Sequence, residues 1–267
     1  MSRIVLGIEY DGSAFAGWQW QKARRSVQAC VEEAVGKVAD APVSVVCAGR
    51  TDAGVHAYEQ VAHFDTAVER PLRAWWMGVN MHLPEDVRVL WAQAAPDGFH
   101  ARASALARHY RYIILNRPVR SALERGRVTW VYRSLDEKAM HVAAQVLVGE
   151  HDFSAFRAQG CQSRSPCRRV YLIDVLREGD RVMIDIVANA YLHHMVRNIA
   201  GALIAVGEGR ERPEWVGEVL AGRDRTRAGV TAPPDGLYLA GICYPEHFGL
   251  PRQPIFQRLP PDARRYT

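Results

Sequence analysis

The sequence has no long apolar run. Its longest, near residues 199–206, is far too short for a helix that crosses a bilayer. The first strand-like segment carries Arg3 and Glu9, charges that are not typical of a signal peptide. We therefore expect a soluble, cytoplasmic protein without helical membrane spans.

Cysteine is scarce as well. The five cysteines are Cys30, Cys47, Cys161, Cys167 and Cys243. Their number is odd, and they do not form the close pairs of a zinc ribbon or a redox motif. We expect reduced, mostly structural thiols.

The ligand patterns of metal and nucleotide-cofactor sites are also missing. The adjacent His193 and His194 are expected to point to different sides, and no zinc-type ligand spacing accompanies them. Residues 207–209, Gly-Glu-Gly, follow a predicted helix and lack the later glycine of a dinucleotide-binding fingerprint. The sequence predicts no metal and no cofactor.

Basic charge is present in mild excess. The 34 Lys and Arg against 29 Asp and Glu give a net charge of +5, which permits an acidic partner such as RNA without requiring one. Lys and Arg outnumber Asp and Glu in residues 21–25, 100–111 and 157–169, with aromatic residues in or beside each segment. This mixture suits phosphate contacts combined with base stacking, although each cluster alone is equally typical of a solvated face.

The apolar spacing predicts strands and helices in both halves of the chain. The predicted strands cover residues 4–10, 43–47, 60–64, 87–93, 108–116, 170–176, 182–187 and 237–244. Predicted helices cover residues 27–38, 136–148 and 195–206, with others beginning near Pro71 and after Pro213. Strict strand-helix alternation is absent, so the predicted fold class is α+β.

The length of 267 residues favours two modest domains. We predict an N-terminal α+β domain over residues 1–105 that carries Asp52. A C-terminal α+β domain is predicted over residues 106–267, which include Tyr110, Arg197 and Leu237. The tail after Pro251 lacks periodicity and is predicted to lie along the surface.

The most informative segment is residues 48–56, Ala-Gly-Arg-Thr-Asp-Ala-Gly-Val-His, which place one carboxylate in a turn of small residues directly after an apolar strand. Gly49 and Gly54 permit a sharp turn and the close approach of a substrate. Arg50 can hold Asp52 as the anion where burial favours the protonated form. The pattern predicts a nucleophilic aspartate. The alternative is a surface turn whose polar side chains bond their own backbone.

The string G-R-T-D-A-G-V-H-A in this segment resembles the signature of the pseudouridine synthases related to bacterial tRNA pseudouridine synthase A. Further matching segments follow in family order at residues 6–12, 17–19, 99–102, 108–114, 149–153, 161–164, 189–198 and 235–239. The resemblance implies two similar α+β halves joined through a central, largely antiparallel sheet. It also implies a catalytic cleft between the halves and a homodimer.

The resemblance further implies the reaction. Uridines at positions 38, 39 and 40 in the anticodon stem-loop of tRNAs would be flipped out of the stem and isomerised to pseudouridine. The uracil leaves C1′ through N1 and rejoins through C5 without redox change, so no cofactor is demanded. Asp52 is the implied nucleophile. Attack at C1′, attack at C6 and assistance of an elimination all stay open.

Further site residues follow from the same resemblance. Arg50 would brace the gap left by the flipped base, Arg197 would lie near the carboxylate, Tyr110 would stack on the target base and Leu237 would pack against the uracil. Without the resemblance, the sequence indicates an ordinary helix arginine at Arg197 and core residues at Tyr110 and Leu237. The implied RNA contacts are Phe99, His100, Ala101, Arg102, Ala103, Gly160, Cys161, Gln162, Ser163 and Arg164.

Among these RNA contacts, Arg102 and Arg164 are the main expected phosphate ligands, with Arg157, Arg168 and Arg169 extending the track. One position departs from the family pattern: Trp20 stands where relatives commonly carry a polar or basic residue. A contact made there is either lost in this chain or replaced by stacking.

Two other functions remain compatible with the residues. A base-removing glycosidase also uses a carboxylate and base flipping. An RNA-binding module without catalysis accounts for the basic and aromatic segments alone. The set of motifs around Asp52 favours the isomerase.

Overall fold

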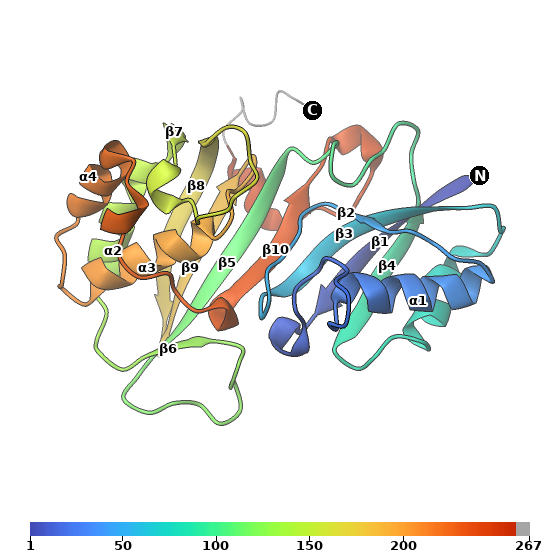
Figure 1. Ribbon diagram of the computed structural model, residues 1–267, viewed down its shortest axis with the longest axis horizontal. Helices are drawn as coiled ribbons and strands as arrows, with labels where there is room; N and C mark the ends of the chain where they lie inside the picture. The colour runs from blue at the N-terminus through green and yellow to red at the C-terminus, as the bar shows by residue number, and fades with distance from the viewer. Residues whose placement is uncertain (260–267) are drawn as a thin grey trace. The chain divides into compact units, whose positions relative to one another are not determined.

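The computed structural model describes residues 1–259 (Figure 1). The fold is mixed α+β and is built on a large, mostly antiparallel sheet, which confirms the predicted fold class. The chain divides into two compact units. Unit 1 comprises Met1–Arg108 and the described residues from Tyr238 onward, and unit 2 comprises His109–Leu237. The predicted boundary after residue 105 stays a prediction.

Unit 1 is organised around two long strands. Its strands are β1 (Ser2–Tyr10), β2 (Val46–Cys47), β3 (His56–Thr66), β4 (Val87–Ala94) and, from Tyr238 on, β10 (Leu237–Cys243). They follow the order β4-β1-β3-β10, with β2 paired to β3. The β1 strand is antiparallel to both neighbours, whereas β10 runs parallel to β3. Because β3 begins four residues after Asp52, the sheet fixes one end of the candidate site.

Helix α1 (Val27–Ala39) lies across the strands of unit 1 (Figure 1). Its apolar residues recur at helical spacing, and Val27, Val31 and Val35 are buried, as the sequence predicts. The buried Ser26 hydroxyl accepts a hydrogen bond from the Ala29 amide and caps the first turn. A second helical segment, with a π-helical stretch at Ala74–Gly78, follows Pro71.

Unit 2 contains most of the remaining strands and helices. Its strands are β5 (Ala107–Asn116, from His109 on), β6 (Thr129–Val131), β7 (Gly149–Asp152), β8 (Cys167–Glu178) and β9 (Arg181–Ala188), in the order β5-β9-β8-β7 with β6 on β5. The helices are α2 (Glu137–Ala144), α3 (Met195–Gly207) and α4 (Trp215–Gly222). The predicted β8–β9 hairpin is confirmed, with Gly179 at a φ of 57° in its turn.

Short 3-10 turns connect the larger elements. They cover Gly12–Ala14, Gln145–Leu147, Ser154–Phe156, Arg225–Arg227, Pro234–Gly236, Glu246–Phe248 and Pro254–Arg258. Within the predicted surface tail, Phe256 and Leu259 are buried, whereas Pro251, Pro254, Gln257 and Arg258 are exposed. The rest of that tail, residues 260–267, lies outside the described residues. Over residues 1–259 no helix is both long enough and apolar enough to cross a membrane.

Candidate active site

The Asp52 turn joins β2 to β3, and hydrogen bonds hold its backbone at both ends. At its start, the fully buried Gln60 side chain bonds both the carbonyl and the amide of Gly49. At its end, the amide of Val55 donates to the Asp52 carbonyl over 3.1 Å, and Gly54 adopts a φ of 78°. The predicted sharp turn at Gly54 is therefore confirmed. Asp52 itself is half-buried.

A loop that follows β1 packs directly on this turn. The amide of Trp18 donates to the Thr51 carbonyl over 3.0 Å, and the Tyr10 hydroxyl lies 2.7 Å from the Thr51 hydroxyl. Gly17 permits this approach: its φ is 102°, and a Cβ there would lie 2.7 Å from the Thr51 oxygen. A side chain at Gly12 would likewise collide with the Val55 carbonyl. Two glycines therefore seat the loop against the backbone that carries Asp52.

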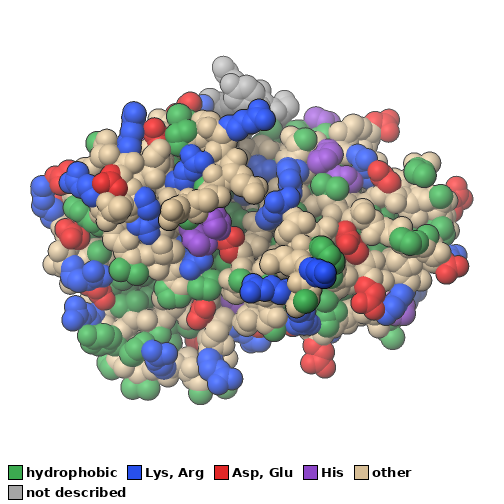
Figure 2. Space-filling view, viewed as in Figure 1, with side chains coloured by type: hydrophobic (Ala, Val, Ile, Leu, Met, Phe, Trp, Pro, Cys, Tyr) green, Lys and Arg blue, Asp and Glu red, His purple; other side chains and the backbone are tan. Residues whose placement is uncertain are grey.

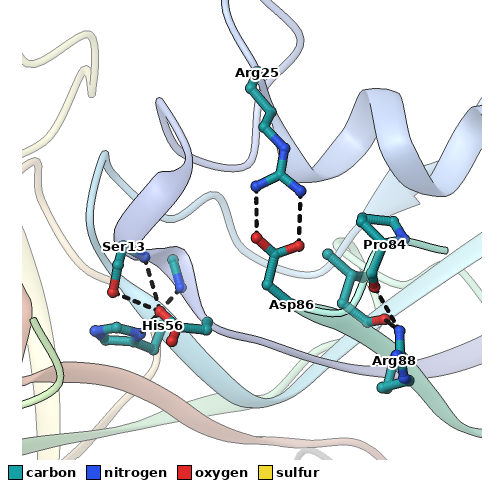
Figure 3. A network of polar contacts seen from close by, with 9 residues as sticks. Ser13, Arg25, His56, Pro84, Asp86 and Arg88 are labelled. Carbon is teal, nitrogen blue, oxygen red and sulfur yellow. Dashed lines mark hydrogen bonds and ion pairs between the residues drawn. The ribbon is translucent and has the colours of Figure 1, made fainter. Parts of the chain in front are cut away.

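His56, which closes the motif, supports the same loop. It is almost fully buried, and its Nδ1 accepts a hydrogen bond from the Gly12 amide over 3.0 Å. The same nitrogen lies 3.2 Å from Asp11 Oδ1, which also accepts from the amide and hydroxyl of Ser13 (Figure 3). On its other side the imidazole stacks on Tyr238, with ring centroids 4.6 Å apart. These contacts give His56 a structural role in holding the turn.

The predicted RNA segment at residues 99–103 divides into a buried and an exposed part. Phe99 and Ala101 are fully buried, whereas Arg102 and Ala103 are exposed. His100 is half-buried, and its Nδ1 accepts from the amides of Arg102 and Ala103. Arg102 therefore projects from a turn whose backbone is held from within.

One arginine ties that segment to the Asp52 turn. Arg108 Nη2 donates to the Ala48 carbonyl and to the Arg102 carbonyl, each over 3.1 Å. Unit 1 thus brings together the residues around Asp52 and those around Arg102. Arg50 lies in the same turn and is exposed.

A buried histidine fixes the inner side of residues 99–103. His63 on β3 accepts a hydrogen bond from the Ala101 amide over 3.1 Å. Burial lowers the pKa of His63 to about 4, with smaller contributions from Arg3 and His100. The imidazole is therefore neutral at physiological pH and acts as an acceptor.

In unit 2, Tyr110 lies on β5 with 9% of its surface exposed. Its ring meets that of Tyr191 edge to face, with centroids 4.9 Å apart, and the Tyr191 hydroxyl donates to the Ile186 carbonyl. Arg197 on α3 is half-buried, and its Nε donates to the Ala232 carbonyl over 2.8 Å. Leu237 begins β10 and is 5% exposed. The neighbours of Tyr110 and Arg197 thus restrict their orientation.

The second predicted RNA segment, residues 160–164, is a loop held by internal arginines. Arg157 Nη2 donates to the carbonyls of Cys161 and Ser163, and Arg168 Nη2 donates to the Ser163 hydroxyl. Arg157 and Arg168, predicted to extend the phosphate track, therefore serve the loop itself. Gly160, Gln162 and Arg164 are exposed.

The Cys161 thiol is half-buried in this loop. Burial raises its pKa, but hydrogen bonds from the amides of His193 and Ser163 and the nearby Arg157 guanidinium outweigh burial, so the pKa lies below the ordinary value of a thiol. The loop therefore offers a polar, cation-lined surface around Cys161.

The predicted orientation of His193 and His194 is wrong. Their rings face each other, with centroids 3.9 Å apart. His194 adopts a φ of 58°, and this left-handed conformation before α3 turns the two side chains to one side. The sequence pattern assumed an extended backbone, in which neighbouring side chains alternate.

Some supporting residues carried no recognisable signal of their own. Gln60 and Arg108 bond backbone carbonyls of the site and Tyr10 bonds the Thr51 hydroxyl, each from another part of the chain, so local spacing does not reveal these contacts. Gly12 and Gly17 lie in two of the segments that carried the family resemblance, but only the packed structure gives them a role.

Comparison with known proteins identifies the family of this chain. A family model described as tRNA pseudouridine synthase matches residues 7–102 and 143–245, which include Asp52, Arg197 and Leu237. The chain is 65% identical over 264 residues to a Methylococcus capsulatus protein named tRNA pseudouridine synthase A, covering 99% of this chain and 97% of the relative.

Two further relatives carry the same name. One, from Coxiella burnetii, is 55% identical over 255 residues and covers 96% of this chain and 98% of its own length. The other, from Vibrio cholerae, is 54% identical over 260 residues, with 97% and 98% covered. The similarity therefore extends over both units.

Proposed function

This chain belongs to the tRNA pseudouridine synthase family, and from that premise we propose that it modifies the anticodon stem-loop of tRNAs with Asp52 as its nucleophile. It is an isomerase that converts uridine to pseudouridine. By analogy with the family, the target uridines are those at tRNA positions 38, 39 and 40. The enzyme works as a homodimer in the cytoplasm.

The observation that carries the proposal is the support around Asp52. Gln60, Thr51 and Gly17 fix the backbone on either side of the carboxylate, which itself is half-buried. A nucleophile needs such fixed positioning, because small displacements from the reacting atom cost large factors in rate. A surface turn that merely connects two strands has no need of it.

The reaction balances within the nucleotide. The N1–C1′ bond breaks, the uracil turns, a C5–C1′ bond forms, and the proton on C5 leaves while N1 gains one. Asp52 assists the cleavage, either by adding to C1′ or to C6 or by removing a sugar proton. Flipping the uridine out of the stem costs a few kcal/mol, about the energy of unstacking, which contacts to the extruded nucleotide offset.

The other site residues take the roles that their types permit. Arg50 braces the space left by the flipped base, and Tyr110 stacks on the uracil. Leu237 packs against the base, and Arg197 favours the ionised carboxylate of Asp52. The exposed Arg102 and Arg164 bind phosphates of the stem. The remaining residues of the two RNA segments, 99–103 and 160–164, set the conformation of these loops.

A tritium-release assay tests the proposal. With tRNA labelled at uracil C5, the wild-type protein is expected to release label into water, and Asp52→Asn is expected to abolish release while leaving tRNA binding intact. Asparagine keeps the size of the side chain but cannot act as an anion. Unchanged release by Asp52→Asn contradicts the proposal.

The mass of the product separates the isomerase from the two alternatives. Pseudouridine has the mass of uridine, whereas a glycosidase leaves free uracil and an abasic site. An RNA-binding module gives binding without label release in either variant. Mapping the modified positions then tests the assignment to the anticodon stem-loop.

A further inference from the structure

Trp20 presents a large apolar side chain to solvent beside the candidate active site. It is 56% exposed, whereas Trp18, two residues earlier, is 1% exposed. Trp18 bonds the Thr51 carbonyl, and the Cα atoms of residues two apart lie at most about 7 Å from each other. The backbone of Trp20 therefore lies close to a residue that bonds the turn carrying Asp52.

The loop that carries Trp20 is well ordered by its own hydrogen bonds. The Trp20 amide donates to Gln28 Oε1 over 3.0 Å, and the Gln28 amide donates to the Trp18 carbonyl over 3.0 Å. Gln21 Nε2 donates to the Ala16 carbonyl, and a bridge between Gln21 and Arg24 closes the tip. The loop is thus built to hold Trp20 in place, not simply to connect β1 to α1.

Arg25 anchors the base of the same loop. Its guanidinium makes two hydrogen bonds to the Asp86 carboxylate, of 2.5 and 2.8 Å (Figure 3), and lies 4.0 Å from the centre of the Phe15 ring. The main chain of Arg25 also accepts from the Ala16 amide. Arg25 is therefore engaged within the protein, and the cations of the tip are Lys22 and Arg24, both exposed.

The charged residues next to Trp20 in the sequence are all basic, whereas in space Asp86 pairs with Arg25 and Glu32 accepts a hydrogen bond from the Gln28 side chain. No Asp or Glu occurs between Gly12 and Val31, so Lys22 and Arg24 have no acidic neighbour in this stretch of sequence. An exposed aromatic ring beside two cations is the combination that binds single-stranded nucleic acid, where the ring stacks on a base and the cations meet phosphates. Because the loop is already ordered, binding costs little conformational entropy.

We infer that the Trp20 loop, residues 19–25, binds the tRNA substrate next to the reacting uridine, with the indole stacked on an unpaired base and Lys22 and Arg24 on its flanking phosphates. This inference rests on the proposed function for its substrate. Stacking on Trp20 does not depend on which RNA base is present, because every base offers a stacking face.

Substitutions at Trp20 test the stacking. Trp20→Ala is expected to weaken tRNA binding about tenfold and to lower kcat/KM by a similar factor, mainly through KM, since a stacked base contributes to binding. Trp20→Phe keeps an aromatic face and is expected to retain most of the affinity. The matched control is Trp76→Ala: Trp76 is also exposed in unit 1, at 45%, but lies beside the exposed apolar residues Leu72 and Met77. It is expected to bind tRNA as the wild type does.

The salt dependence of binding separates stacking from charge. Trp20→Ala is expected to lower affinity at every salt concentration without changing the slope of log K against log salt. Lys22→Ala and Arg24→Ala are each expected to reduce that slope by about 0.7 to 0.9, the value for one lost phosphate contact. Thermal unfolding of each variant is measured alongside the binding curves as a control for its folding.

Three results overturn the inference. They are equal tRNA affinity of Trp20→Ala and wild type, equal losses in Trp20→Ala and Trp20→Phe, and equal losses in Trp20→Ala and Trp76→Ala. The binding measurements do not depend on turnover. If the wild type binds tRNA but releases no label, the proposed isomerisation is contradicted. The comparison of the Trp20 variants then still tests whether the loop binds tRNA.

Discussion

At the scale of single residues, the position of Asp52 is set by contacts that its neighbours make. The carbonyl of Thr51 accepts from Trp18, and the two polar groups of Gly49 are bound by Gln60. Main-chain contacts of this kind do not depend on the carboxylate itself. The Asp52 side chain can therefore be changed without removing these main-chain hydrogen bonds.

Gly17 tests how closely the loop must approach the turn. Gly17→Ala places a Cβ about 2.7 Å from the Thr51 oxygen, at a φ of 102° that disfavours any side chain. The expected cost is about 1–3 kcal/mol in the free energy of unfolding, measured by urea titration. In the protein that stays folded, turnover is expected to fall on the order of a hundredfold, because the displaced turn carries Asp52.

Gly179→Ala is the matched control for that substitution. Gly179 also has a positive φ, of 57°, but a Cβ there meets no other atom within 4 Å. It is expected to cost about 1–2 kcal/mol from the backbone alone and to leave turnover per folded molecule unchanged. Equal turnover losses in the two variants refute the role of Gly17.

The sequence predicted the site residues themselves better than the groups that each of them contacts. The motif predicted a sharp turn at Asp52, and Gly54 has a φ of 78° in that turn. The sequence did not predict that Arg157 and Arg168 bind the carbonyls and hydroxyl of their own loop, while Arg164 remains exposed. Arginine spacing alone does not distinguish an internal hydrogen bond from a phosphate contact, because both depend on the backbone path.

At the scale of elements, a buried carboxylate links β9 to β5 inside unit 2. Asp185 is 3% exposed, lies 2.6 Å from His109 Nε2, and accepts two hydrogen bonds from Arg111. Burial raises the pKa of Asp185, but the hydrogen bonds from His109 and Arg111 outweigh burial, so the pKa lies below its ordinary value. His109 and Arg111 flank Tyr110 on β5, so this contact also fixes the strand that carries the tyrosine.

Removing that charge is expected to destabilise the protein. Asp185→Asn should lower the free energy of unfolding by roughly 2–4 kcal/mol, because Arg111 and His109 lose a buried anionic partner. Glu124→Gln is the control, since Glu124 pairs with Arg181 on the surface and is expected to cost less than about 1 kcal/mol. Equal losses in the two variants by urea unfolding contradict the buried role of Asp185.

His63 predicts how stability depends on pH. Its folded pKa is about 4 against an ordinary value of 6.5, so between these values the unfolded chain binds a proton that the folded protein does not. The contribution of His63 to the free energy of unfolding is complete above pH 6.5 and is lost as the pH falls toward 4. We expect a loss of up to about 2–3 kcal/mol over this range.

The control for the pH dependence is His63→Gln, which keeps an acceptor for the Ala101 amide but has no titrating group. The difference in unfolding free energy between wild type and His63→Gln is expected to narrow as the pH falls from neutral to about 4. A constant difference across that range shows that His63 does not titrate as described.

Long elements were predictable, and short ones were not. The cap at Ser26 and the spacing of buried residues identify α1, and the turn at Gly179 identifies the β8–β9 hairpin. The predicted strand at 43–47 shrinks to Val46–Cys47, because the Val45 amide donates to the Glu32 side chain instead of a neighbouring strand. Neither β6 nor β7 was predicted, because three or four residues are too few to establish an alternating pattern.

At the scale of the whole molecule, the net charge of +5 is too small to determine where RNA binds. On the face in Figure 2, Lys and Arg side chains are interspersed with Asp and Glu. We therefore expect specific exposed cations on shaped loops to supply the phosphate contacts. Arg102 in unit 1 and Arg164 in unit 2 meet this description.

One tRNA that contacts both units should respond additively to the loss of these arginines. Arg102→Ala and Arg164→Ala are each expected to reduce the slope of log K against log salt by about 0.9, the value for one phosphate of a duplex, and the double variant by about twice that. Lys138→Ala, which removes an exposed cation from α2, is expected to leave the slope unchanged. Filter binding of tRNA over a salt series measures all four proteins. A double variant no weaker than either single variant would mean that the two arginines do not contact the same bound RNA, and the division of the binding surface between the units would have to be abandoned.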